Sequence, residues 1–187
     1  KSKETNIILN GNTEGLKASH SRALLKLYQR RIPRDRFIHP DLARRMTELS
    51  RELKRQIGVM ADRNGEIVHV ICGDAHQLFI PDLKRHRAGS DRFRGLRLLH
   101  THLRGEGLSR DDLTDLALLQ LDAVVAIQAD PQGLPGKIEM GHLDPAAEID
   151  SSEPWAIVKV PSVYDWPLHF RNFIEAIEAE FSAKDKG

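Results

Sequence analysis

The sequence predicts an α/β fold in which a mixed sheet is covered by helices, and two observations lead to this prediction. Residues 57–72 change from helical to alternating apolar spacing around Asp62-Arg63-Asn64-Gly65, which is typical of a strand, a tight turn and a strand. Residues 109–120 then have a helical pattern and are followed directly by the apolar strand Ala123–Ile127. A helix packed between neighbouring strands in this compact order favours a parallel crossover and a sheet with helices on its faces.

The residues before the hairpin predict one short strand and two helices. Residues 1–9 are expected to be an N-terminal arm or a short strand, because the apolar run 7–9 precedes the turn sequence Asn10-Gly11. A helix is expected over 19–31. A second is expected from Pro40 to Gln56, because apolar residues recur there at three- and four-residue steps. These residues are Leu42, Met46, Leu49 and Leu53.

The residues after the hairpin predict further strands and one more helix. Strands are expected over 76–80, 96–100 and 137–142, the last of them at a sheet edge. Ser109 is a favourable N-cap for the helix at 109–120. Residues 144–167 are rich in acids and prolines and predict irregular surface structure.

The chain is expected to form one main α/β domain over residues 10–167. Its length of 187 residues is ordinary for a single domain, and its 40% hydrophobic and 29% charged residues are typical of a globular protein. Residues 168–187 are expected to be an amphipathic helix and a polar tail. No apolar run is long enough to cross a membrane. The one cysteine, Cys72, lies in an apolar run and predicts a core position and a cytoplasmic protein.

The net charge of +1 conceals a division between the two parts of the chain. Residues 1–110 contain 23 basic and 12 acidic residues, whereas residues 111–187 contain 5 basic and 15 acidic residues. A basic half of this kind favours contact with RNA, although solvated helix surfaces or pairing between the two halves explain it as well. The candidate RNA contacts on the second helix are Arg44, Arg45, Arg51, Lys54 and Arg55.

A candidate metal site begins at His100-Thr101-His102. Residues two apart on a strand face the same side, so both imidazoles could converge on one ion. Asp112, in the first turn of the next helix, could complete a set of two histidines and one carboxylate that suits zinc. Ser109 could then stabilise an oxyanion while it caps the helix. The alternative is that the histidines serve packing and that Ser109 and Asp112 serve only the helix terminus.

The sequence contains no nucleotide-binding loop. The pattern G-x-x-x-x-G-K-[ST], whose backbone and lysine hold phosphates, is absent. GTP hydrolysis by this chain alone is therefore not expected.

Several phrases of the sequence recur together in one family. They are Gly11-Asn12-Thr13-Glu14-Gly15-Leu16-Lys17-Ala18, Glu52–Val59, Gly73-Asp74-Ala75-His76, Gly95–Glu106 and Asp111–Ala117. Through them, the chain from about Asn10 to Phe181 resembles the N-terminal extension of long-form HflX GTPases.

HflX proteins are GTPases that bind the large ribosomal subunit and can split stalled ribosomes. The resemblance implies that the GTPase portion, with its GTP and magnesium, would lie beyond Gly187. It also implies that this chain is an accessory domain whose partners are that GTPase portion and the RNA of the large ribosomal subunit.

A second resemblance is to the JAMM metalloproteases and RadC-like proteins, which carry H-x-H and then S-x-x-D. It implies a JAMM/RadC-like, cytidine-deaminase-like architecture. His100, His102 and Asp112 match the metal ligands, and Ser109 matches the serine. The general-base glutamate of those proteins would fall at 54–56, where this chain has Lys-Arg-Gln, which leaves only Glu52 or Glu66 as substitutes.

Three hypotheses follow. The first is a non-catalytic accessory domain that modulates the GTPase or its docking on the ribosome through the basic half. The second is a zinc-dependent, JAMM-like hydrolase or a degenerate metal-binding domain. The third is a dimerisation module that uses exposed strand edges or the C-terminal helix.

Overall fold

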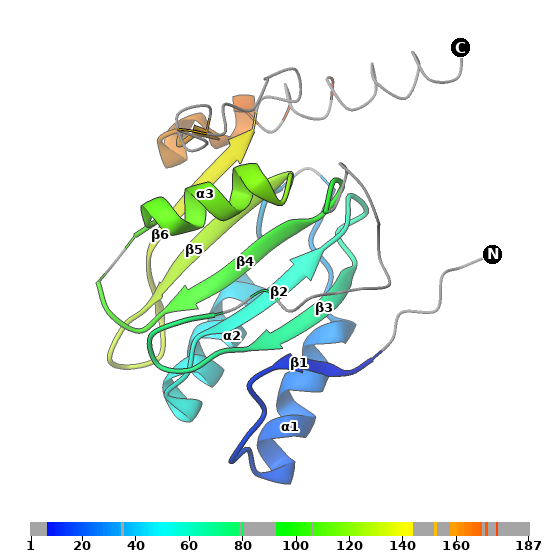
Figure 1. The fold of residues 1–187 in the computed structure, drawn as a ribbon, viewed down its shortest axis with the longest axis vertical. Coiled ribbons are helices and arrows are strands. Elements are labelled where there is room, and N and C mark those ends of the chain that lie inside the picture. The colour runs from blue at the N-terminus through cyan, green and yellow to red at the C-terminus, as the bar shows by residue number, and fades with distance from the viewer. Residues whose placement is uncertain are drawn as a thin grey trace, which may run out of the picture.

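Seven strands form one mixed sheet in the computed structural model, which describes residues 7–34, 36–78, 80, 93–105, 107–143, 152, 158–169, 171 and 175. The strand order is β1-β3-β2-β4-β5-β6-β7 (Figure 1). The strands are β1 (Leu9–Gly11), β2 (Ile57–Ala61), β3 (Ile67–Cys72), β4 (Arg97–His102), β5 (Ala123–Ala129), β6 (Pro135–Leu143) and β7 (Val158–Lys159). The predicted α/β fold with a mixed sheet is confirmed.

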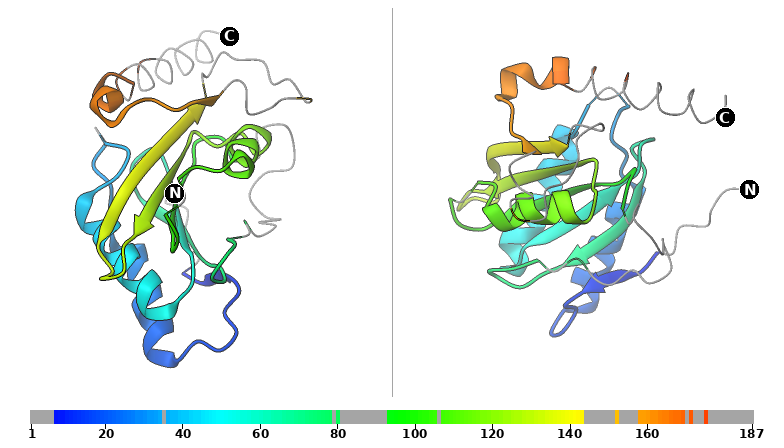
Figure 2. Two further views of the ribbon diagram at one scale, coloured as in Figure 1. Left: turned by 90° about the vertical axis from the view of Figure 1, so that its left-hand side faces the viewer. Right: turned by 45° about the horizontal axis from the view of Figure 1, so that its top comes forward.

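Helices cover both faces of this sheet (Figures 1 and 2). On one face lie α1 (Ala18–Leu25), the 3-10 helix η1 (Lys26–Gln29) and α2 (Pro40–Leu53), and on the other lies α3 (Arg110–Leu118). The larger core lies against α1 and α2 and includes Leu24, Met46, Leu49, Val59 and Leu99. The smaller core lies under α3 and includes Met60, Leu98, Leu116, Leu121 and Val124.

The pairing of the strands follows the predicted turns and crossover. β2 and β3 form an antiparallel hairpin across the turn at 62–66, and β2 also pairs antiparallel with β4. β4 and β5 are parallel neighbours joined through α3, as expected for a crossover. The start of α3 therefore lies near the carboxyl end of β4, where His100 and His102 are found.

The helix α2 has clear start and stop signals. His39 Nδ1 accepts a hydrogen bond from Asp41 N at 3.1 Å, and Pro40 occupies the first helical turn. The helix ends at Leu53, earlier than the expected Gln56, because Lys54 adopts a left-handed conformation with φ of 54°. The chain then turns into β2, and Gln56 becomes a buried residue at the entry to the sheet.

One expectation about strands is wrong, and another holds in part. Residues 76–78 form no strand, because Asp74 Oδ1 accepts hydrogen bonds from His76 N and Gln77 N at 2.8 and 2.7 Å and holds this segment in a tight loop. The strand expected at the sheet edge over 137–142 is present as β6, and β7 lies outside it but pairs only with its last two residues, His142 and Leu143.

Other expectations differ in extent or fall outside the described residues. The first helix is shorter than 19–31 because it tightens into η1 after Leu25. Residues 1–6 and 81–92 and most of the amphipathic helix expected at 168–183 lie outside the described residues. After β7, the 3-10 helix η3 spans Val163–Asp165. Among the described helices, none combines the length and apolar character that a membrane crossing requires.

Candidate metal centre

Successive side chains of β4 face opposite sides of the sheet. Leu98, His100 and His102 face α3, whereas Leu99 and Thr101 face α2. The Thr101 hydroxyl donates to Ser50 Oγ at 2.8 Å and accepts from Ile57 N at 2.9 Å. The strand that carries both histidines is thus fixed to α2 and to the start of β2.

The helix α3 brings a carboxylate over these histidines. Ser109 Oγ accepts from Asp112 N at 3.1 Å, and Asp112 Oδ2 accepts from Ser109 N at 2.9 Å, which completes a capping box. The turn before the helix rests on β6, because Glu139 Oε2 accepts from Leu108 N at 2.9 Å. The carboxylate of Asp112 is therefore positioned both by its own helix and by the neighbouring strand.

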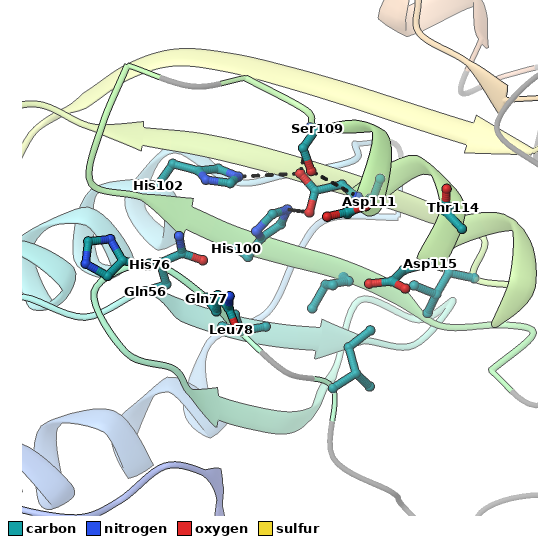
Figure 3. A pocket seen from close by; sticks show the side chains of 15 residues that line it. Gln56, His76, Gln77, Leu78, His100, His102, Ser109, Asp111, Thr114 and Asp115 are labelled. Carbon is teal, nitrogen blue, oxygen red and sulfur yellow. Dashed lines mark hydrogen bonds and ion pairs between the residues drawn. The ribbon is translucent and has the colours of Figure 1, made fainter.

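His100, His102 and Asp112 form one compact group, as the sequence predicts (Figure 3). Their ligand atoms all lie within 4.8 Å of one another. His100 Nε2 is 3.8 Å from Asp112 Oδ1, and His102 Nε2 is 3.6 Å from Asp112 Oδ2. Two bonds of about 2.1 Å to one ion span at most about 4.2 Å, so both separations fit a bound zinc.

Three of the four ring nitrogens of the two histidines lack a hydrogen-bond partner in the described part of the chain. His100 and His102 are 3% and 7% exposed, and among the described residues no hydrogen-bond partner serves His100 Nε2, His102 Nδ1 or His102 Nε2. An unsatisfied buried polar atom costs about 1–3 kcal/mol. A cation held by both rings and the carboxylate would satisfy the Nε2 atoms, so the residues present fit a metal ion.

The electrostatics also favour a metal. Burial lowers the pKa of His100 to about 4, more than Asp112 raises it, so this imidazole is neutral and free to bind a cation at neutral pH. Burial alone would raise the pKa of Asp112, but the His102 and His100 rings and the Ser109 backbone N–H outweigh burial and lower it to about 2. His100 is thus a neutral imidazole and Asp112 an ionised carboxylate, the forms that zinc binds.

The metal group opens onto a pocket of about 560 Å³ (Figure 3). One wall is the start of α3 with Ser109, Asp111, Thr114 and Asp115. The opposite wall is the start of β2 and the loop after β3, and it carries Gln56, His76, Gln77 and Leu78. A volume of this size is ordinary for a small-molecule site.

Two acidic side chains near the group were not among the predicted site residues. Asp115 lines the pocket, and desolvation together with Asp112 and Asp111 raises its pKa. Its spacing of three residues from Asp112 on a helix could have revealed it. Glu139 lies on β6, in line with His100 across the sheet. His100 pairs with Ala126 of β5, and Ala126 pairs with Glu139. No sequence signal links Glu139 to the group, because only the strand pairing brings it there.

Neither glutamate considered as a base lies at the metal group. Glu52 is on α2, on the other face of the sheet, with its carboxylate 3.5 Å from His20 Nε2. Glu66 follows the β2–β3 turn and bridges to Arg31, whereas the histidines are at the opposite end of β4. Of the three residues at 54–56, Gln56 is the one that lines the pocket.

The five basic candidates on α2 divide into two sets. Arg51 donates to the carbonyls of Leu103, Ala129 and Asp130 at 2.7 to 2.8 Å. Arg55 donates to the carbonyls of Asn12 and Glu14. Both guanidinium groups hold loops in place. The other three side chains lie at the surface, one of them in an ion pair with Glu48, and these are Arg44, Arg45 and Lys54.

Comparisons with protein-family models and with curated proteins found no match to this chain.

Proposed function

We propose that this chain is a zinc-binding accessory domain of an HflX-type, ribosome-associated GTPase and is not itself a catalyst. The observation that carries the metal part is the buried group of His100, His102 and Asp112, in which three ring nitrogens lack hydrogen-bond partners among the described residues. The HflX part rests on the sequence phrases between Asn10 and Phe181. On this proposal the domain works in the cytoplasm, and GTP and magnesium belong to a separate GTPase portion of the parent protein.

A stabilising role for zinc follows from the surroundings of the group. Bound zinc supplies a positive charge and Lewis acidity. Hydrolysis also needs a side chain that accepts a proton from water, and the pocket wall at the start of β2 offers the neutral amide of Gln56. On the proposal, the three ligands tie the end of β4 to the first turn of α3, and this link is the contribution of the metal.

Zinc content is the first test. The protein is purified without chelator, its metal content is measured by mass spectrometry, and zinc affinity is measured by competition with a chromophoric chelator. We expect one zinc per chain and loss of tight binding in His102→Ala. His76→Ala, which alters a pocket histidine outside the ligand group, is the matched control and should keep its zinc. A wild-type protein without affinity for zinc would end the metal part of the proposal.

The ribosomal part is tested on the exposed cations of α2. Binding of ribosomal RNA is measured by filter retention across a range of salt concentrations. Replacing Arg44, Arg45 and Lys54 by alanine should weaken binding and flatten its salt dependence, because each lost phosphate contact removes about 0.9 from the slope. If wild-type protein shows no affinity for the RNA at low salt, direct contact between this domain and RNA is wrong.

Modulation of the GTPase is tested in the parent protein. GTP hydrolysis and binding to large ribosomal subunits are compared between the intact protein and His102→Ala in the same background. A domain that acts on the GTPase through its folded metal centre should change one of these two activities. If the two proteins hydrolyse GTP and bind large subunits equally well, the metal centre does not influence the GTPase.

A second candidate function is a zinc-dependent hydrolase, and one observation favours it. The pocket of about 560 Å³ contains Asp115, whose raised pKa is suited to taking up and releasing a proton. Zinc-loaded protein is assayed against peptide and amide substrates. Turnover that is lost in both Asp112→Ala and Asp115→Asn would replace the non-catalytic proposal.

A further inference from the structure

A second cavity, of about 630 Å³, lies on the face of the sheet opposite the metal centre. Its walls come from residues 36–38, the first turn of α2, two positions of β6 and residues 166–167. Phe37, Ala43, Ile138 and Trp166 belong to the core on the α2 side, so the cavity is continuous with that core. None of the metal ligands contributes to it.

The indole of Trp166 forms part of the apolar wall of this cavity. The ring packs edge-on against Phe37, with ring centroids 6.5 Å apart and an interplanar angle of 80°. Its Nε1 is buried, so it is closed to a ligand in the cavity as well as to water. The two rings therefore offer the ligand apolar, aromatic surface.

The charged residues of the cavity have one sign. Arg36 and Arg44 are the charged side chains that line it, and both are exposed. Neither guanidinium forms an ion pair with another residue in the described part of the chain. The first turn of α2 also contributes to the wall, and a helix N-terminus carries partial positive charge. The rim therefore favours an anion, whereas the interior is apolar.

We propose that this cavity binds a small organic carboxylate with a flat, apolar body. The body occupies the space between Phe37, Ile138 and Trp166, and the carboxylate lies toward Arg36 and Arg44. Arginine is well suited to a carboxylate because its donors form a planar fork. This inference is independent of zinc and of any hydrolase activity.

The test uses two probes that differ in charge, naphthalene-2-carboxylate and the neutral naphthalene-2-methanol, with the whole chain and calorimetric titration. We expect the carboxylate to bind at least about fivefold more tightly than the alcohol, which corresponds to about 1 kcal/mol. Equal affinity of the two probes, or no detectable binding of the carboxylate, would overturn the proposal.

Variants locate the probe in the cavity. Arg44→Gln and Arg36→Gln should each weaken carboxylate binding about fivefold, since each removes one charged contact. Arg45→Gln is the matched control, because Arg45 lies on the same helix, pairs with Glu48 at 3.1 Å and does not line the cavity. Its affinity should stay within about twofold of wild type. Arg44 is exposed, so its substitution leaves the core intact; an unchanged affinity in Arg44→Gln contradicts the proposal.

Discussion

Ser109 and Asp112 hold each other by two reciprocal hydrogen bonds of 3.1 and 2.9 Å, and the same Asp112 carboxylate faces His100 and His102. Asp112, the acidic residue of the capping box of α3, therefore also supplies the carboxylate of the candidate metal centre. The contacts that form the helix terminus also position a member of the ligand group. A change at Ser109 should consequently affect both helix stability and metal affinity.

Ser109→Ala should lower the free energy of unfolding by about 1 kcal/mol, the usual cost of losing a serine N-cap. Zinc affinity should also fall, by less than about tenfold, because the substitution loosens the helix turn that carries Asp112 but keeps the Ser109 backbone N–H that donates to its carboxylate. Urea unfolding and chelator competition measure the two effects. Ser109→Thr keeps the hydroxyl and should restore both. A variant with lower stability and unchanged zinc affinity would separate the cap from the metal centre.

Thr101→Val should lower the free energy of unfolding by about 1–3 kcal/mol, because it leaves the buried Ile57 N–H without its acceptor. The loss is measured by urea unfolding of the metal-free protein. Thr13→Val is the control, since Thr13 is exposed and its hydroxyl has no such role. If both variants lose a similar free energy of unfolding, the hydrogen bond from Ile57 N to Thr101 is not the cause.

Arg51→Met should destabilise the protein by about 2–4 kcal/mol, because three backbone carbonyls on two loops lose a charged donor. Arg45→Ala removes an exposed ion pair and should cost less than about 1 kcal/mol. Thermal unfolding compares the two. We expect any loss of RNA binding in Arg51→Met to follow its loss of folded protein, in contrast to Arg44→Ala.

The metal-free protein should lose stability as the pH falls from about 6.5 to about 4. In this range unfolded His100 binds a proton and folded His100 does not, because burial lowers its pKa to about 4. The shift corresponds to at most about 3 kcal/mol. Urea unfolding with a chelator present, at several pH values, measures the slope. His100→Gln should show a smaller slope than wild type, and equal slopes would assign the effect to other groups.

The sequence was sufficient to predict those helices and strands whose local pattern agrees with their tertiary contacts. The hairpin at 57–72, the N-cap at Ser109 and the parallel strand at 123–127 were all predictable from spacing and turn chemistry. The metal group was predictable because H-x-H on a strand and a carboxylate in the next helix turn place the ligands through local geometry.

Residues brought together by strand pairing were not predictable in this way. Glu139 is 37 residues from His102 in the chain and reaches the same end of the sheet through β5 and β6. Gln56 faces the pocket because Lys54 ends α2 in a left-handed conformation, which propensity alone does not indicate. The strand expected at 76–80 does not form over residues 76–78, because the Asp74 side chain accepts hydrogen bonds from the backbone N–H groups of His76 and Gln77, which a strand would donate to its neighbour.

The two outermost strands of the sheet are very short. β1 has three residues, and β7 has two. β7 pairs only with His142 and Leu143, so among the described residues the outer side of β6 from Pro135 to Gly141 has no strand partner. Pro135 and Lys137 lie on this border, and proline and lysine on a sheet edge hinder pairing with a second molecule. We expect these two residues, rather than the short end strands, to limit cross-β aggregation at the concentrations that metal and ligand titrations require.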